Sequence, residues 1–223
     1  MSAEDQSTGI VVAAHGRHYV VETDAAVLVR CVPRGKKSVL ACGDRVRFAP
    51  AGRDAGVVES FEPRDSLFLR AAPHRQKVIA ANATQVAVVV AGEPSFSDEL
   101  VCRILVAAEG QAIRSLIVLN KSDLASAAHA AQARLRDFAM AGYSVLAISA
   151  KTDVQPLIER LTNETTVLIG QSGMGKSTIV NGLVPGAGLR TQEISTFLDS
   201  GRHTTSATRL FRLPGGGAII DSP

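Results

Sequence analysis

The sequence predicts an α/β protein in two parts, a small N-terminal β-barrel followed by a doubly wound parallel sheet. Three observations support this prediction. Short β-branched segments separated by Gly, Pro and Asp fill the chain up to about residue 61, strand and helix patterns alternate from Gln85 onward, and a glycine-rich loop joins one such strand to a helix. Alternation of this kind is typical of a parallel sheet covered by helices. We expect the two domains to span residues 1–78 and 79–223.

The composition is that of an ordinary globular protein, because 46% of the 223 residues are hydrophobic and 20% are charged. No apolar run is long enough for a membrane span and the N-terminus is polar, so we expect a cytoplasmic protein without membrane contact. We also expect a monomer. The 3 cysteines are too scattered for a disulfide framework or a metal site. A net charge of +3 indicates no general affinity for polyanions, so any nucleic-acid contact must come from a local cluster.

The first part of the chain contains five strand patterns, over residues 9–12, 19–22, 25–30, 45–48 and 56–60. This number of short strands in so few residues predicts an OB-fold-like barrel. Its basic residues concentrate in the section from Arg30 to Arg47, and five of them form a cluster of candidate RNA contacts: Arg34, Lys36, Lys37, Arg45 and Arg47. A solvated strand face is the simpler interpretation of this cluster. Few aromatic residues accompany it, so stacking on single strands is poorly supported, whereas recognition of structured RNA stays open.

The second part alternates strands with helices. We predict strands over residues 85–91, 115–119, 143–148, 165–169, 207–213 and 218–220. The predicted helices span residues 98–109, with Ser97 as the N-cap, 127–141, 153–161 and 176–183. Ligands of doubly wound sheets gather at the carboxyl ends of the strands. Every motif described below follows such an end.

A phosphate-loop pattern, GxxxxGK[ST], follows the predicted strand 165–169 and opens the next helix. Backbone N–H groups of such a loop surround phosphate oxygens at the positive end of the helix. Lys176 is expected to bridge the β- and γ-phosphates, and Ser177 to bind Mg²⁺. The candidate phosphate-binding residues are Gly170, Gln171, Ser172, Gly173, Met174, Gly175, Lys176, Ser177 and Thr178.

A second motif, Asn120-Lys121-Ser122-Asp123, follows the predicted strand 115–119. Asp123 can accept the N1–H and the exocyclic amine of guanine, a pair of donors that adenine lacks. Asn120 is expected to tie this loop to the phosphate loop, and the Lys121 stem to lie over the base. One strand later, Ser149-Ala150-Lys151 offers the Ala150 N–H to guanine O6, with Ser149 shaping the turn. The motif alone is also compatible with a helix cap, but together with the phosphate loop it predicts binding of GTP and GDP.

The segment 185–206 has no clear periodicity and resembles a switch region that the γ-phosphate and its metal ion order. Within it, Thr205 is the favoured Mg²⁺ ligand over Thr204. His203 is the candidate for orienting the attacking water, although a lone loop histidine is more often a surface residue. Asp221 ends the last strand as the expected Asp of DxxG, which binds Mg²⁺ through water. The catalytic candidates are thus His203, Thr205 and Lys176, and the metal candidates Ser177, Thr205 and Asp221.

The base-reading motif precedes the phosphate loop, which reverses the usual order of these motifs along the chain. A circular permutation explains this order, and it is tolerated where the original termini lie close together at the surface. The predicted fold is therefore a circularly permuted P-loop GTPase domain preceded by an OB-fold-like barrel.

The order NKSD, SAK, GQSGMGKST, GRHTT and DSP after a barrel resembles the RsgA (YjeQ) family of circularly permuted GTPases. The resemblance implies a GTPase that acts late in assembly of the small (30S) ribosomal subunit, binds 16S rRNA and is stimulated by the 30S particle. It also implies a C-terminal zinc-binding domain, of which these 223 residues contain no counterpart, so we assign zinc to none of them. Because the sequence ends inside DxxG, we expect it to bind nucleotide and to hydrolyse GTP poorly.

Two other functions are compatible with parts of the sequence. One is an RNA-binding module in which the nucleotide has only a structural role. The other is an ATP-using kinase or ATPase, which the NKSD and SAK motifs together disfavour.

Overall fold

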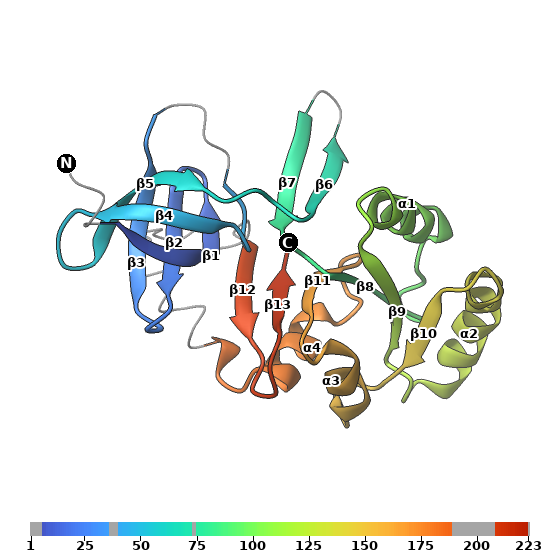
Figure 1. The fold of residues 1–223 in the computed structure, drawn as a ribbon. Coiled ribbons are helices and arrows are strands. Elements are labelled where there is room, and N and C mark those ends of the chain that lie inside the picture. Colours follow the sequence, from blue (N-terminus) through green and yellow to red (C-terminus); the bar gives the residue numbers. More distant parts are fainter. Residues whose placement is uncertain (1–5, 36–39, 73–74, 189–207, 223) are drawn as a thin grey trace. The chain divides into compact units, whose positions relative to one another are not determined.

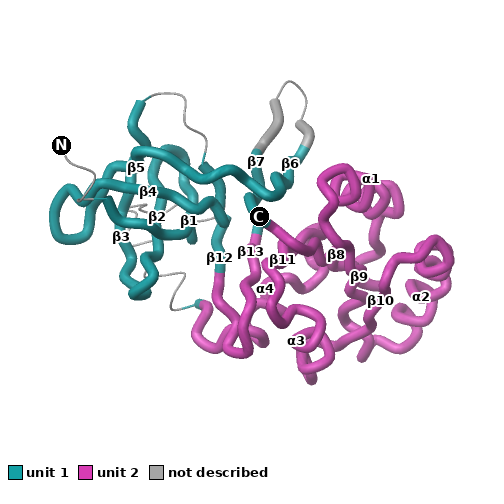
Figure 2. The backbone as a smooth tube through the Cα atoms, in the orientation of Figure 1, with its two compact units in different colours: residues 1–82, 188–210, 222–223 teal, residues 83–187, 211–221 magenta. Residues whose placement is uncertain are grey.

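The computed structural model describes residues 6–35, 40–72, 75–188 and 208–222 (Figure 1). The chain forms two compact units (Figure 2). The first comprises residues 1–82, 188–210 and 222–223, and the second comprises residues 83–187 and 211–221. Each unit is described by itself below.

The first unit contains the barrel. Its strands are β1 (Ser7–His15), β2 (His18–Thr23), β3 (Leu28–Pro33), β4 (Arg45–Pro50) and β5 (Ala55–Phe61). Strand β1 pairs antiparallel with both β2 and β4. The remaining pairs are β2 with β3 and β4 with β5, both antiparallel, and β3 with β5, which is parallel. Every strand has two neighbours, so the sheet closes on itself and the prediction of an OB-like barrel is confirmed.

Side chains along the barrel strands alternate between buried and exposed, and the buried ones fill the interior of the barrel. In β4, Val46 and Phe48 are buried while Arg45 and Arg47 face solvent. The buried core cluster comprises Val11, Tyr19, Val21, Val29, Cys31, Leu40, Val46, Phe48 and Val58. Burial in this apolar cluster raises the pKa of the Cys31 thiol to about 12. An inert, protonated thiol agrees with the expectation that Cys31 serves the core.

The predicted start of the third strand, at residue 25, is wrong. Strand β3 begins at Leu28 because a turn precedes it, in which Ala26 has a positive φ of 59°. The Thr23 side chain closes this turn by accepting from the Val27 N–H at 3.2 Å. A left-handed residue cannot continue a strand, so the turn delays it.

A hairpin that the sequence analysis did not predict follows the barrel. Its strands β6 (Leu67–Ala72) and β7 (Arg75–Ala81) form a separate antiparallel two-stranded sheet. Apolar and polar residues alternate only weakly along these strands, and alanines dilute their β-propensity. These segments therefore form strands because they pair with each other, and their own composition does not predict it.

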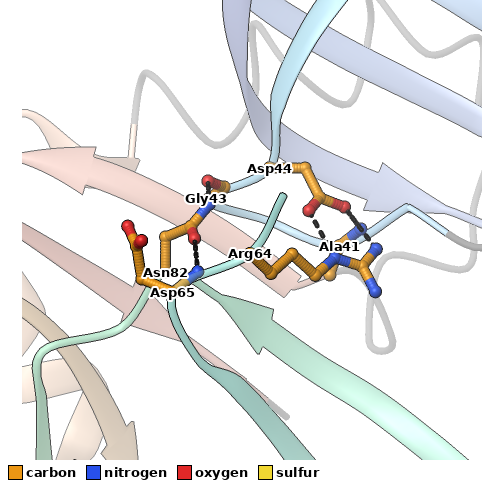
Figure 3. A network of polar contacts seen from close by, with 6 residues as sticks. All are labelled: Ala41, Gly43, Asp44, Arg64, Asp65 and Asn82. Atoms are coloured by element: carbon orange, nitrogen blue, oxygen red, sulfur yellow. Dashed lines mark hydrogen bonds and ion pairs between the residues drawn. The ribbon is translucent and has the colours of Figure 1, made fainter. Parts of the chain in front are cut away.

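A buried polar network fastens the connection after β5 to the barrel (Figure 3). The Asp44 side chain is fully buried and accepts from Arg64 Nε and Nη2, both at 2.7 Å, and from the Ala41 N–H at 2.8 Å. Beside it, Asn82 Nδ2 donates to the Gly43 carbonyl at 2.9 Å, and Asn82 Oδ1 accepts from the Asp65 N–H at 2.9 Å. The network satisfies its buried carboxylate completely, as a buried charge requires.

The second unit holds the doubly wound sheet. Its strands and helices in chain order are β8 (Gln85–Ala91), α1 (Asp98–Glu109), β9 (Arg114–Asn120), α2 (Ala125–Met140), β10 (Ser144–Ala147), α3 (Gln155–Leu161), β11 (Thr165–Ile169), α4 (Lys176–Leu183) and β13 (Ala218–Asp221). Strand β12 (Thr208–Arg212) begins in the first unit and leads through a turn into β13. The strand order is β10-β9-β8-β11-β13, and each neighbouring pair is parallel. The carboxyl ends of these strands therefore share one edge of the sheet, where the motifs lie.

Several boundaries differ from the predicted ones. Helix α2 starts at Ala125 rather than at 127, and β10 covers only Ser144–Ala147. Helix α3 starts at Gln155 rather than at 153, and its N-cap is Val154. Before it, the Asp153 carboxylate accepts from the Gln155 N–H at 2.8 Å, a local turn bond typical of aspartate. The predicted strand start at residue 207 lies outside the described residues.

The predicted cap of α1 is confirmed, since Ser97 Oγ accepts from the Leu100 N–H. Among the helices that the structure describes, none combines the length and the apolar character needed to cross a bilayer.

Candidate nucleotide-binding site

The phosphate loop follows β11, an inner strand of the second unit's sheet. Strand β11 lies between β8 and β13, and helix α4 begins at Lys176 directly after the loop. Gly175 caps this helix with a φ of 89°. A Cβ atom on Gly175 would lie 2.3 Å from Asn120 Nδ2, so both the backbone conformation and the close approach require glycine here.

Asn120 connects the three loops of the candidate site. Its side chain is 2% exposed, donates from Nδ2 to the Met174 carbonyl at 2.9 Å and accepts at Oδ1 from the Ala150 N–H at 3.0 Å. One amide thus joins the base-reading motif, the phosphate loop and the Ser149-Ala150-Lys151 loop. We predict the Ala150 N–H as the donor to guanine O6. In the structure it donates to Asn120 Oδ1, so that role, which stays a prediction, requires the N–H to turn to O6 or to be shared with it.

The Asp123 carboxylate is exposed and held in place by Ser149, whose Oγ donates to Asp123 Oδ1 at 2.7 Å. This hydrogen bond lowers the pKa of Asp123 below its usual value, and the charges of Lys151 and Lys121 act in the same direction. The group is ionised at neutral pH, as an aspartate usually is, and the ionised form has acceptor positions beyond the one that Ser149 uses. The arrangement suits a carboxylate that accepts two N–H donors of a base.

Lys176 lies half-buried inside the phosphate loop. Its Nζ donates to the carbonyls of Gly170 at 2.7 Å and Gln171 at 3.1 Å. Burial lowers the pKa of Lys176, while the carboxylate of Asp221 opposes that shift. Because a buried ammonium needs a negative partner, this position favours an anion such as a phosphate beside the loop.

The candidate ligands for Mg²⁺ that the structure describes lie at the same edge. Ser177 is exposed in the first turn of α4, beside Thr178 of the phosphate-binding set, and Asp221 ends β13, paired in register with Leu168 of β11. A hydroxyl and a carboxylate are oxygen ligands of the kind that Mg²⁺ prefers. The residues present therefore fit this ion. In the loop itself, Ser172 and Gly173 are exposed, whereas Met174 is buried.

Several predicted residues lie outside the part of the chain that the structure describes, namely His203, Thr204, Thr205, Lys36 and Lys37. Of the other RNA candidates, Arg45 and Arg47 share the outward face of β4. Arg45 is ion-paired with Asp65 at 3.2 Å, and Arg34 with Glu59. A role of these arginines in RNA binding stays a prediction.

The sequence analysis missed the loop between β8 and α1, residues 92–97. Lys121 Nζ donates to the Glu93 carbonyl in this loop at 2.8 Å. A signal was available, since the loop follows the carboxyl end of a strand that neighbours both β9 and β11. The segment contains no recognisable motif, so only its place in the sheet marks it.

Comparison with known proteins agrees with this geometry. A family model described as RsgA GTPase matches residues 61–223. The chain belongs to the RsgA GTPase family. As a member of that family it is a GTPase, and its nucleotides are GTP and GDP, which confirms the resemblance and the enzyme class that the motifs predict.

Two relatives share the description "Small ribosomal subunit biogenesis GTPase RsgA". The protein of Nitrosomonas europaea is 52% identical over 219 residues, which is 97% of this chain and 70% of that protein. The protein of Bordetella pertussis is 48% identical over 225 residues, covering 99% of this chain and 75% of that protein. The match with RsgA proteins thus extends over both units of the chain.

Two solved structures share the fold. YjeQ from Thermotoga maritima superposes with a TM-score of 0.72 at 29% identity, over 98% of this chain and 74% of that chain. YloQ, described as a circularly permuted GTPase, gives a TM-score of 0.67 at 25% identity, over 100% of this chain and 74% of that chain. The predicted fold, a permuted GTPase domain after an OB-like barrel, is confirmed.

Proposed function

We propose that this RsgA-family GTPase is a nucleotide switch in late maturation of the small (30S) ribosomal subunit, which it contacts through 16S rRNA in the cytoplasm as a monomer. One observation supports the proposal most. The Asn120 side chain joins a guanine-reading loop to a phosphate loop, in a chain whose relatives are named small ribosomal subunit biogenesis GTPases. A site built in this way binds a guanine nucleotide at both of its ends.

The chain's own residues divide the work of binding and hydrolysis. Asp123 accepts from the guanine ring, and Ala150 donates to O6. The N–H groups from Gly170 to Gly175 surround the β-phosphate, and Lys176 bridges the β- and γ-phosphates. Bound Mg²⁺ would neutralise charge that develops on the phosphates. Ser177 and Thr205 would hold it directly and Asp221 through water, while His203 orients the attacking water.

The switch requires that the ribosomal particle distinguish the two nucleotide states. A nucleotide can shift attachment only by as much as its states differ in affinity for the partner. We propose that GTP favours the bound state and that hydrolysis favours release. The basic cluster of the barrel, Arg34, Lys36, Lys37, Arg45 and Arg47, would supply the rRNA contacts, because such a cluster neutralises phosphates and carries no base preference by itself.

We expect Thr205→Ala to abolish the GTP-dependent response while leaving GDP binding within about twofold of the wild type, because in our proposal Thr205 binds the metal from its γ-phosphate side. GTP turnover is measured with and without purified 30S subunits, for this chain and for a version extended past Pro223. Thr162→Ala is the matched control, since it removes a threonine hydroxyl outside the candidate site, at the end of α3, where it donates to the Ile158 carbonyl at 3.0 Å.

The proposal predicts a rise in turnover with 30S subunits in the extended protein and its loss in Thr205→Ala. Absence of any 30S-dependent rise in the extended protein would refute the ribosomal role. If Thr205→Ala behaves as the wild type in every assay, the nucleotide is a structural ligand of an RNA-binding module instead.

A further inference from the structure

We propose that Gln171 is a positioning residue, whose side chain fastens the phosphate loop to the N-terminus of helix α1 and so holds the loop in its phosphate-binding shape. The inference concerns nucleotide affinity and does not depend on the ribosomal role. The phosphate-loop pattern specifies a backbone conformation that binds phosphate. Our proposal is that the Gln171 side chain helps to hold that conformation.

The fastening is a single hydrogen bond between distant parts of the chain. Gln171 Oε1 accepts from the Ser97 N–H at 2.8 Å, across 74 residues of sequence. Ser97 is the N-cap of α1. In a capping box, a Glu or Gln at the third helical position reaches back to this N–H. Here the third position is Leu100, which has no acceptor, and Gln171 takes that place from the phosphate loop.

The other partner of this bond belongs to a segment that is itself well anchored. The β8–α1 loop, residues 92–97, receives Lys121 Nζ at the Glu93 carbonyl. From α2, Arg134 donates to Ser95 Oγ at 2.8 Å and to the Phe96 carbonyl at 2.9 Å, and its guanidinium lies 4.0 Å from the centroid of the Phe96 ring. Lys121 and Arg134 thus anchor the β8–α1 loop, which can therefore position the Gln171 side chain that it contacts.

The phosphate loop meets the β8–α1 loop at a second place. Gly173 has a φ of 81°, and a Cβ atom there would lie 3.1 Å from Pro94 Cγ. The bond from Gln171 and the close approach of Gly173 thus fix two positions on the part of the loop that precedes Lys176.

Gln171 also reaches the lysine of the loop through its main chain. Its carbonyl accepts from Lys176 Nζ at 3.1 Å, while its side chain is held by Ser97. A phosphate loop binds well when its N–H groups already point inward, since ordering them on binding lowers affinity. Loss of the Gln171 anchor should therefore weaken binding of the phosphates and leave recognition of the base unchanged.

The test compares Gln171→Met, which keeps the length of the side chain and removes its acceptor, with the wild type in binding GDP, IDP and GMP. We expect GDP and IDP affinity to fall together, by about 3- to 10-fold for one lost hydrogen bond, and GMP affinity to change less than twofold. A fluorescent GDP should also dissociate faster by a similar factor. Gln171→Asn, whose amide is one methylene shorter, is expected to give the same result and replaces Gln171→Met if that variant does not fold.

Ser97→Ala is the matched control, because it removes the Oγ cap of α1 and keeps the N–H that Gln171 uses. We expect it to lower the melting temperature without changing the ratio of GDP to GMP affinity. The inference is wrong if the Gln171 variants bind all three nucleotides like the wild type, if GMP affinity falls as much as GDP affinity, or if Ser97→Ala reproduces their selective loss.

Discussion

Asp123→Asn is expected to reverse the base preference of this GTPase, lowering GDP affinity by about a thousandfold or more. In the proposed site the carboxylate accepts two N–H donors of guanine, whereas an asparagine amide has one acceptor oxygen and would turn its NH₂ group toward the second donor. A binding site loses more when donor faces donor than when a bond is merely absent, because both groups have left water. Xanthine carries an oxygen where guanine carries its amine, so the same variant should gain affinity for XDP.

The surroundings of Asp123 make this a clean substitution. Ser149 Oγ, which donates to Asp123 Oδ1 at 2.7 Å, has a hydroxyl that can donate equally to an amide oxygen. The loop geometry should therefore survive. Dissociation constants of GDP, XDP and ADP are measured for both proteins by competition with a fluorescent nucleotide.

Asp153→Asn serves as the control for Asp123→Asn. It makes the same chemical change in the loop that precedes α3, where the side chain accepts from the Gln155 N–H at 2.8 Å. We expect it to leave the ratio of GDP to XDP affinity unchanged. An Asp123→Asn protein that still preferred guanine over both xanthine and adenine by the wild-type ratio would contradict the assignment of Asp123.

Asp44→Ala is expected to lower the free energy of unfolding of the first unit by about 3–5 kcal/mol, the usual effect of removing one partner of a buried ion pair. The Asp44 side chain is fully buried, and the Arg64 side chain is 16% exposed. Without the carboxylate, two guanidinium N–H donors and the Ala41 N–H lose the acceptor that they share in the native protein. Figure 3 shows how these donors converge on one side chain.

Urea denaturation measures this effect, with the slope of the transition checked for two-state behaviour. Asp65→Ala is the control, because the Asp65 side chain is 74% exposed and pairs with Arg45 at the surface. An exposed pair of this kind is worth about 0.5 kcal/mol. If Asp44→Ala destabilised the protein no more than Asp65→Ala, the buried network would not hold the connection after β5 to the barrel.

Much of the second unit could be predicted because its signals are local. Strand β8 is buried along its whole length and is apolar in all but its first residue, and α1 has its cap at Ser97 and its stop near Gly110. The boundaries of β11 and α4 follow directly from the phosphate-loop pattern between them. Patterns of this kind depend on residues within one or two turns of each other, so the sequence contains them in full.

The missed elements depend on partners that are distant along the chain. Strands β6 and β7 show little alternation of apolar and polar residues, and each is a strand because it pairs with the other. Asp44 looks like any loop aspartate until Arg64 is placed beside it, and nothing near Gln171 shows that its amide meets Ser97. Contacts between residues that are distant along the chain form only when the chain has folded, so local sequence patterns do not predict them.

For this protein the sequence alone determined the chemistry: a guanine-reading motif, a phosphate loop, and the permuted order that joins them to the RsgA GTPases. The tertiary structure decided which side chains join distant parts of the chain. Asn120 joins the loops of the site, Gln171 accepts from the N-cap residue of α1, and Asp44 pairs with Arg64 of the connection after β5. The division has a physical reason. A ligand is bound by short motifs whose spacing is visible in the sequence, whereas the shape of the site depends on contacts between loops that are distant along the chain.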